Sequence, residues 1–221
     1  SIGNFPSLRC LEQIRNSISY HMCKVLIVSN GSGFSYGQLG SSHHATEDFG
    51  VMRSIPNINI YTPCTNKMVE ASINHWIENY NPGYIRLDKQ SFSNEKYLIK
   101  ESKCLEDIVI IKASNKIRNE LHIFAGGISS LLNGKDLEVD ICLINYVPKG
   151  LNQKLINEII HYKKVVVYEE HNIDNGFGSY VAWHIVKSKF LIEIESKSIQ
   201  NQLPSYVGDQ NYMRKSQGIT F

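Results

Sequence analysis

The chain has 221 residues, 42% of them hydrophobic and 20% charged, which is typical of a soluble globular protein with one large domain or two modest ones. Its formal net charge of +2 argues against nucleic acid or a membrane surface as a partner. The sequence has no apolar run of transmembrane length and no signal-peptide pattern, so we expect a cytoplasmic protein.

The first half of the sequence predicts helices and strands in alternation. The expected elements are a helix around 8–18, a strand over 24–29, a helix over 47–54, a strand over 58–61, a helix over 62–79 and a strand over 83–87. A glycine-rich loop joins the first strand to the second helix. This order predicts a mostly parallel sheet with helices on its faces.

The polar stretch 88–107 has no clear period and predicts an interdomain linker. A second α/β unit follows, with strands expected over 121–125, 139–144, 165–168 and 190–194 and helices over 152–161 and 178–187. The segment 126–138 leaves room for only a short helical connection between the first two of these strands. The predicted fold class is α/β, with two open, mostly parallel sheets flanked by helices.

The five cysteines are scattered and form no CxxC pair: Cys10, Cys23, Cys64, Cys104 and Cys142. We interpret them as reduced thiols of a cytosolic protein rather than a disulfide framework or a zinc site. The sequence begins with Ser1 and not with methionine, which suggests a processed, truncated or partial chain.

The stretch 31–57 is the part of the sequence that most suggests chemistry. A loop containing four glycines leads to His43 and His44, directly before the helix expected over 47–54. One hypothesis is metal binding, since each histidine has an acid four residues later, Glu47 or Asp48. Adjacent residues point about 100° apart on a helix, so we expect no metal site. The alternative is that these acids favour the helix N-terminus through its dipole.

Two further patterns in this loop are weak. Ser41 and Ser42 next to His43 could imitate a serine–histidine pair, but no GxSxG motif is present. GSGFSYG matches neither a P-loop nor a GxGxxG turn that opens a helix. On pattern alone the loop is a flexible backbone platform.

Outside the loop, two groups of charged residues leave open interpretations. Glu169 and Glu170 end an expected strand and precede His171, which indicates either a ligand site or, as we favour, a solvated strand end. Arg86 lies in an otherwise apolar strand and either reaches solvent or meets an anion. The sequence does not decide between these roles for Arg86.

Taken together, these segments resemble the transketolase family, including 1-deoxyxylulose-5-phosphate synthase and the C-terminal subunits of split transketolases. GSSHHATEDFGVMRSIPNINIYTP is similar to a stretch of that family's pyrimidine-binding domain, and GYIRL extends the match. LHIFAGG, VDICLINYVPKGLN, VVVYEEHNIDNGFGSYV and VGDQNYMRKSQGIT resemble its C-terminal domain. The resemblance implies a partial pyrimidine-binding domain over 1–95, incomplete at its N-terminus, and a C-terminal domain over 96–221.

The resemblance also implies an enzyme that uses thiamine diphosphate and Mg²⁺ to move two-carbon units between sugar phosphates or keto acids. Phe5 matches the family's aromatic residue against the aminopyrimidine ring, and His43 matches its catalytic histidine facing the donor substrate. Arg86 matches an arginine that holds the sugar phosphate, and His44 is expected to support substrate binding. These residue types suit a flat heterocycle, a proton and a phosphate.

Two parts of the family's machinery have no counterpart in this sequence. They are the glutamate that activates the cofactor and the GDG…N segment that binds diphosphate and metal. The resemblance therefore implies a homo-oligomer, or a hetero-oligomer with a diphosphate-binding N-terminal subunit, and a chain that is inactive alone. The alternative is a non-catalytic interaction or scaffolding subunit with a degenerate thiamine site.

Overall fold

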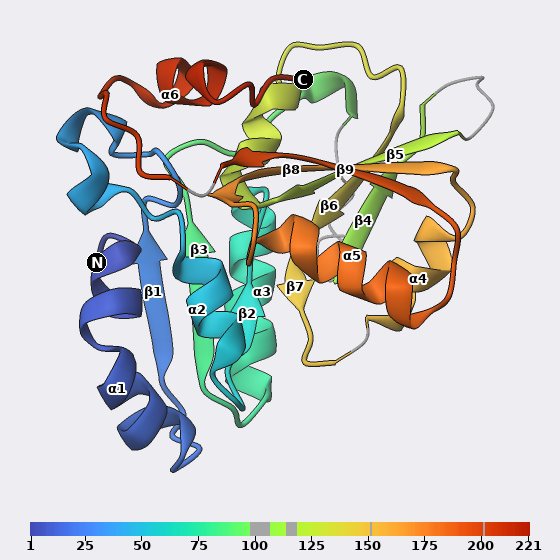
Figure 1. Ribbon diagram of the computed structural model, residues 1–221. Helices are drawn as coiled ribbons and strands as arrows, with labels where there is room; N and C mark the ends of the chain where they lie inside the picture. Colours follow the sequence, from blue (N-terminus) through green and yellow to red (C-terminus); the bar gives the residue numbers. More distant parts are fainter. Residues whose placement is uncertain (98–106, 114–118, 151, 201) are drawn as a thin grey trace.

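The computed structural model describes residues 1–97, 107–113, 119–150, 152–200 and 202–221 (Figure 1). In the first half, helical turns at Phe5–Arg9, α1 (Leu11–Gln13) and Ile14–Ser19 precede β1 (Leu26–Asn30), α2 (Asp48–Ser54), β2 (Asn59–Tyr61), α3 (Asn66–Glu78) and β3 (Gly83–Leu87). In the second half follow β4 (Ile108–Ile111), β5 (Glu120–Ala125), β6 (Asp140–Ile144), β7 (Tyr146–Val147), α4 (Gln153–Ile159), β8 (Lys164–Asn172), α5 (Phe177–Lys187), β9 (Glu193–Ile199) and α6 (Gln210–Ser216).

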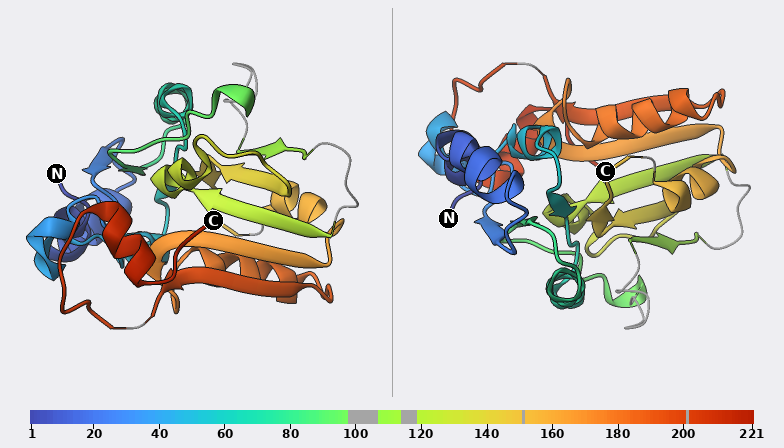
Figure 2. Two further views of the ribbon diagram at one scale, coloured as in Figure 1. Left: turned by 90° about the horizontal axis from the view of Figure 1, so that it is seen from above. Right: turned by 90° about the horizontal axis from the view of Figure 1, so that it is seen from below.

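These strands form two sheets. The first has the order β1-β3-β2-β7 and the second has the order β4-β6-β5-β8-β9. All pairs are parallel except those made by the edge strands β7 and β4. Helix α5 lies along β8 and β9, and α6 crosses one end of the molecule toward the first half (Figure 2). The predicted α/β class with two mostly parallel sheets flanked by helices is confirmed.

Most predicted elements lie within a few residues of their positions in the structure, and the differences have local causes. Helix α3 begins at Asn66 rather than at residue 62, because the Thr65 hydroxyl accepts the Met68 N–H at 3.1 Å and caps the first turn. The strand expected over 190–194 is displaced to Glu193–Ile199. Strands β4 and β7 and helix α6 were not predicted; β7 has only two residues, and α6 is mostly polar.

The two halves share one sheet edge. β7 belongs to the second half of the chain but pairs with β2, so that Ile60 lies opposite Val147. The division at residues 95 and 96 stays a prediction. Of the linker expected over 88–107, residues 98–106 lie outside the described part of the chain.

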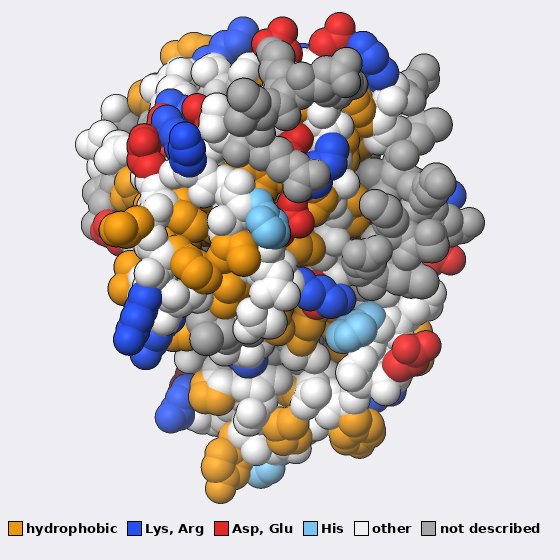
Figure 3. All heavy atoms as spheres, turned by 90° about the vertical axis from the view of Figure 1, so that its right-hand side faces the viewer, with side chains coloured by type: hydrophobic (Ala, Val, Ile, Leu, Met, Phe, Trp, Pro, Cys, Tyr) orange, Lys and Arg blue, Asp and Glu red, His pale blue; other side chains and the backbone are white. Residues whose placement is uncertain are grey.

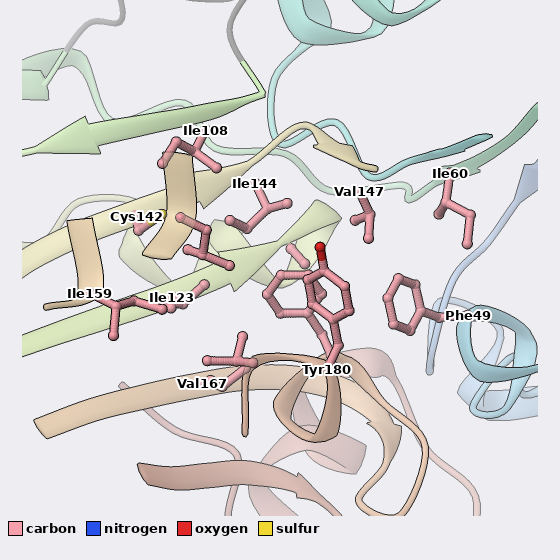
Figure 4. Packing of buried hydrophobic residues seen from close by; sticks show 14 of the residues in the cluster. Phe49, Ile60, Ile108, Ile123, Cys142, Ile144, Val147, Ile159, Val167 and Tyr180 are labelled. Carbon is pink, nitrogen blue, oxygen red and sulfur yellow. The ribbon is translucent and has the colours of Figure 1, made fainter. Parts of the chain in front are cut away.

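The core runs continuously from the first sheet into the second. Figure 4 shows Phe49 from α2 and Ile60 from β2 on one side, and Ile123, Val167 and Tyr180 from the second half on the other. Each of these side chains is at most 4% exposed. A buried apolar interface of this kind fixes α2, and with it the loop that precedes it, against the second half.

The distribution of charged side chains on the surface agrees with the small net charge of the chain. Basic and acidic side chains are interspersed on the face shown in Figure 3. Among the described residues, no helix is long and apolar enough to cross a membrane.

Candidate functional site

The glycine-rich loop leaves the C-terminal end of β1 and reaches α2 through two short helical turns, Gly37–Leu39 and Ser41–His43. Gly33 has φ +53° and lies against Glu170 of β8, whose Oε2 accepts the Phe34 N–H at 2.7 Å. A larger residue at this position would be strained by the left-handed backbone conformation, and its side chain would clash with Glu170. The second half of the chain therefore shapes the loop that carries His43.

The loop brings His43 next to Phe5. Their rings meet edge to face, with centroids 5.5 Å apart. Asn4 Nδ2 donates to the Ser42 carbonyl, which ties the N-terminal helical turn to the loop. Ser42 Oγ lies 3.0 Å from His43 Nδ1, so the opposite nitrogen, Nε2, is the one left for another group. The structure thus joins two residues that lie far apart in sequence.

The guanidinium of Arg9 lies over the Phe5 ring. The guanidinium carbon of Arg9 lies 4.6 Å from the Phe5 ring centroid, and Arg9 is itself exposed. A planar group on an aromatic face is the geometry that a bound heterocycle also needs. Arg9 therefore covers a face of the Phe5 ring, the surface on which a flat ring would have to pack.

A cavity of about 560 Å³ opens beside this pair. It is lined from the first half by Asn4, Leu8, Ser41, Ser42, His44 and Glu47, and from the second half by Asn172, Ile199, Gln200, Gln202 and Leu203. Phe5 and His43 flank the cavity but do not line it. Asn4 Oδ1 is buried without a hydrogen-bond partner, and burial raises the pKa of Glu47. An unpaired acceptor and a carboxyl that holds its proton more tightly suit a polar ligand.

His44 lines the same cavity from a more enclosed position. It is 2% exposed, with its ring edge-on to Phe34 at a centroid distance of 5.1 Å and Nε2 3.3 Å from the Gly37 carbonyl oxygen. Burial lowers its pKa, and Nδ1 has no hydrogen-bond partner. Its predicted role in substrate binding stays a prediction.

Arg86 is buried, and its hydrogen bonds go to other groups of the protein. Its Nε donates to Asp48 at 2.8 Å, and its Nη2 donates to the carbonyls of Ala45 and Glu170 at 3.0 and 3.3 Å. The side chain is only 8% exposed, so the interpretation that it reaches solvent is wrong. The anion that Arg86 meets is the carboxylate of Asp48, which also accepts the Tyr84 hydroxyl at 2.6 Å. Phosphate binding by Arg86 stays a prediction, and these contacts favour a structural role.

The residues considered for a metal site lie apart. Helix α2 begins at Asp48, so the histidines precede it and do not share a helix face with Glu47 and Asp48. Asp48 pairs with Arg86, and His44 bonds to the loop backbone. Within the described ranges, no group of three or more His, Cys, Asp or Glu side chains could hold a metal ion.

Glu169 and Glu170 are not a solvated strand end, because they are only 4% and 2% exposed. Glu169 accepts the N–H groups of Phe177 and Gly178, with the latter at 3.1 Å, and so satisfies the first turn of α5. Burial raises its pKa to about 7. Burial also lowers the pKa of His171 to about 4, and Phe49 packs edge-on against that ring. The solvated interpretation was wrong because β8 continues through these residues into the core.

Three residues that shape the loop and the cavity, Asn4, Arg214 and Gln210, were missed in the sequence. Asn4 gives no sequence signal, since an isolated asparagine near a chain end is ordinary. Arg214 of α6 is 1% exposed, and its Nε donates to Glu170. Gln210, one turn earlier, donates to Glu170 Oε2 at 3.1 Å. Two acids ending an apolar strand were the available signal, because a buried carboxylate needs a cation.

The geometry of the loop, the aromatic pair and the cavity can be set beside known proteins. Residues 2–94 match the family model described as the transketolase pyrimidine binding domain. Among curated proteins, the chain is 30% identical over 220 residues to an apulose-4-phosphate transketolase subunit of Actinobacillus succinogenes, covering 96% of this chain and 69% of that protein. It is 26% identical over 187 residues to the Phocaeicola vulgatus protein of the same name, covering 80% and 58%. The chain thus spans only part of these relatives.

Other similarities extend over the whole chain. It is 25% identical over 223 residues to 1-deoxy-D-xylulose-5-phosphate synthase of Thermotoga petrophila, covering 96% of this chain and 35% of the synthase. A solved structure of a split-gene transketolase, described as an inactive beta4 tetramer, superposes with a TM-score of 0.75 at 22% identity, covering 99% of this chain and 70% of that one. The match in fold, the pyrimidine-domain match and the similarity to a transketolase subunit along nearly the full chain agree, and the chain belongs to the transketolase family.

Proposed function

We propose that this chain is the C-terminal part of a thiamine diphosphate-dependent transketolase that moves two-carbon ketol units between sugar phosphates. The observation that carries the proposal is the contact of Phe5 with His43 at 5.5 Å, beside a cavity lined by both halves. The names of the two apulose-4-phosphate transketolase relatives include a sugar phosphate and support this substrate class for the present chain.

The residues beside the cavity fit the ring end of thiamine diphosphate. Phe5 offers an aromatic face on which a planar cation already lies, and Asn4 Oδ1 is a buried acceptor without a partner. The aminopyrimidine ring is flat and carries an amino donor, and Phe5 and Asn4 are the residues that would hold it. The described residues offer no cluster of metal ligands, and in this proposal a partner that bears GDG…N holds Mg²⁺ and the diphosphate.

When bound, thiamine diphosphate supplies the nucleophilic carbon that carries the two-carbon unit. The chain's own contribution is proton handling and orientation. His43 holds or transfers a proton at Nε2, since Nδ1 faces Ser42 Oγ. Glu47 has a raised pKa and donates or accepts a hydrogen bond with a sugar hydroxyl in the cavity. The apolar side chains of Leu8 and Leu203 line part of the cavity.

The test is a reconstitution assay. The purified chain, an N-terminal transketolase section that bears GDG…N, and their mixture are each assayed for ketol transfer from a ketose phosphate to an aldose phosphate. We expect turnover only in the mixture, and only with thiamine diphosphate and Mg²⁺. Turnover by the chain alone would contradict the division of labour, and an inactive mixture that nevertheless forms a complex would contradict the enzymatic role.

A second candidate function is a non-catalytic subunit. The observation that favours it is that the similar split-gene transketolase structure is described as an inactive tetramer. On this hypothesis the chain self-associates and contributes interface area only. This candidate requires that the mixture forms a complex without turnover. It also requires that substitution of His43 leaves complex formation unchanged.

A further inference from the structure

A second cavity, of about 740 Å³, lies between α2 and α5. It is walled by Arg53 of α2, by Lys149 in the segment after β7, and by Tyr180 and Trp183 of α5. None of its lining residues is shared with the cavity beside Phe5 and His43. Its volume falls within the roughly 300–1,000 Å³ of small-molecule sites, and it lies between two halves of the chain, where such sites are common.

Two cationic side chains, Arg53 and Lys149, line this cavity. Within the described part of the chain, neither Arg53 nor Lys149 lies within ion-pair distance of a carboxylate, although the buried Glu169 acts on Arg53 at longer range. Lys149 Nζ donates to the carbonyls of Ile55 and Arg53 at 2.7 and 3.1 Å, which leaves one of its three protons for another acceptor. Asp174 also lines the cavity but has an interaction of its own. Two adjacent positive groups that no acid of the described residues contacts favour an anion.

Two aromatic side chains, Tyr180 and Trp183, also line the cavity. Trp183 is 43% exposed, and the Tyr180 ring is buried beneath the Arg53 guanidinium, with a distance of 5.5 Å from the guanidinium carbon to the ring centroid. Inorganic phosphate would occupy a small part of a 740 Å³ space. An organic body against the indole would fill more of it and would bury apolar surface.

We propose that this cavity binds a small phosphate monoester with a flat apolar body, with the phosphate held by Arg53 and Lys149 and the body against Trp183. The guanidinium fork suits two phosphate oxygens, and the free ammonium proton of Lys149 suits the third. The ligand would bridge α2 and α5, and so would stabilise the contact between the two halves. The site is separate from the one proposed for ketol transfer and does not depend on it.

The probe is phenyl phosphate, titrated by calorimetry into the full chain, with inorganic phosphate and phenol as the two partial ligands. We expect saturable binding of phenyl phosphate that quenches tryptophan fluorescence, and binding about tenfold weaker or more for either partial ligand. Lys149→Gln and Arg53→Gln remove one charge-assisted bond each and should weaken phenyl phosphate binding about tenfold or more. Lys163→Gln, at an exposed lysine outside the cavity, should leave the affinity unchanged.

A measurement on the unaltered chain covers the case in which a variant fails to fold. Burial and the charge of Arg53 lower the pKa of Lys149 to about 8, and the other ionisable groups facing the cavity are Asp174 and Tyr180. Phenyl phosphate is already a dianion above neutral pH, so its affinity should fall as pH rises through 8. No saturable binding, affinity that is constant from pH 7 to pH 9, or equal loss in Lys163→Gln would each overturn the proposal.

Discussion

At the residue scale, the proposed function assigns the proton chemistry to His43. It is partly exposed, touches Phe5, and has Nδ1 engaged by Ser42, so its free nitrogen can handle a proton beside the cavity. His44, its neighbour, differs because burial lowers its pKa and encloses its ring. Two identical neighbouring residues thus have different environments, and only the fold distinguishes them.

We predict that His43→Asn lowers kcat of the reconstituted enzyme by about 10²- to 10⁴-fold, the usual contribution of a general acid or base. The melting temperature should stay close to that of the parent chain, because the side chain is only partly buried. His161→Asn, at an exposed histidine far along the chain, is the matched control and should keep full activity. Unchanged turnover in His43→Asn would remove the assigned role.

Glu169 carries a pH-dependent part of the stability. Its pKa rises to about 7 in the fold because burial penalises the charged form. A carboxyl with a raised folded pKa stabilises fully below its unfolded value near 4.5, and this stability is lost as pH rises to about 7. The shift corresponds to about 3 kcal/mol.

The corresponding experiment is Glu169→Gln, with unfolding by denaturant followed between pH 5 and pH 7. The parent chain should lose stability across this range relative to the variant, by as much as about 1.4 kcal/mol per pH unit. His171 acts in the opposite sense, since its pKa of about 4 removes stability as pH falls below its ordinary value. Parallel pH curves for parent and variant would show that Glu169 is ionised throughout.

At the element scale, N-capping side chains determine where three of the helices begin. Thr65, Asn152 and Asp209 cap α3, α4 and α6 through bonds to the N–H groups three residues later. Periodicity in the sequence located these helices to different degrees: α3 and α4 were expected, whereas the polar α6 was not. Apolar spacing finds helices that bury an apolar face, and α6 is instead fixed by buried polar contacts.

We predict that Thr65→Ala costs about 1 kcal/mol of unfolding free energy, because one N–H of the first turn of α3 loses its acceptor. Thr220→Ala, at an exposed threonine near the chain end, should cost far less. Equilibrium denaturation of both variants measures the difference, and equal costs would mean that the cap contributes nothing.

At the scale of the whole molecule, α6 connects the second sheet to the glycine loop. Arg214 and Gln210 both bond Glu170, and Glu170 also accepts the Phe34 N–H in the loop. A single buried carboxylate therefore links three segments that are distant in sequence. This link could not be foreseen from the sequence, because no local pattern identifies the cation that pairs with a buried acid.

Arg214→Met should destabilise the chain by about 3–5 kcal/mol, since Glu170 would remain buried without its cation. The double variant Arg214→Met with Glu170→Gln removes both charges and should recover a large part of that loss. Thermal unfolding of the two variants checks this order. A double variant less stable than Arg214→Met would show that the carboxylate acts through its hydrogen bonds rather than through its charge.

The parts of the fold predicted from sequence were those set by apolar periodicity and glycine loops, as in β3 and α5. At the candidate site, the roles of Phe5 and His43 came from the resemblance to the family and not from any local pattern, and they stay predictions. The role of Arg86 was left open because its partner Asp48 lies 38 positions earlier in the chain, at the start of helix α2. Long-range pairing of charged side chains depends on the packed structure, and a sequence pattern does not contain it.

The central claim is that this chain supplies the ring contact of a thiamine diphosphate site completed by a partner subunit. The most direct test is calorimetric titration of thiamine diphosphate with Mg²⁺ into the chain alone, into its mixture with the N-terminal section, and into the same mixture carrying Phe5→Ala. We predict saturable binding to the mixture, at least about tenfold weaker binding with Phe5→Ala, and no tight binding to the chain alone. Tight binding to the isolated chain, or unchanged binding with Phe5→Ala, would contradict this account.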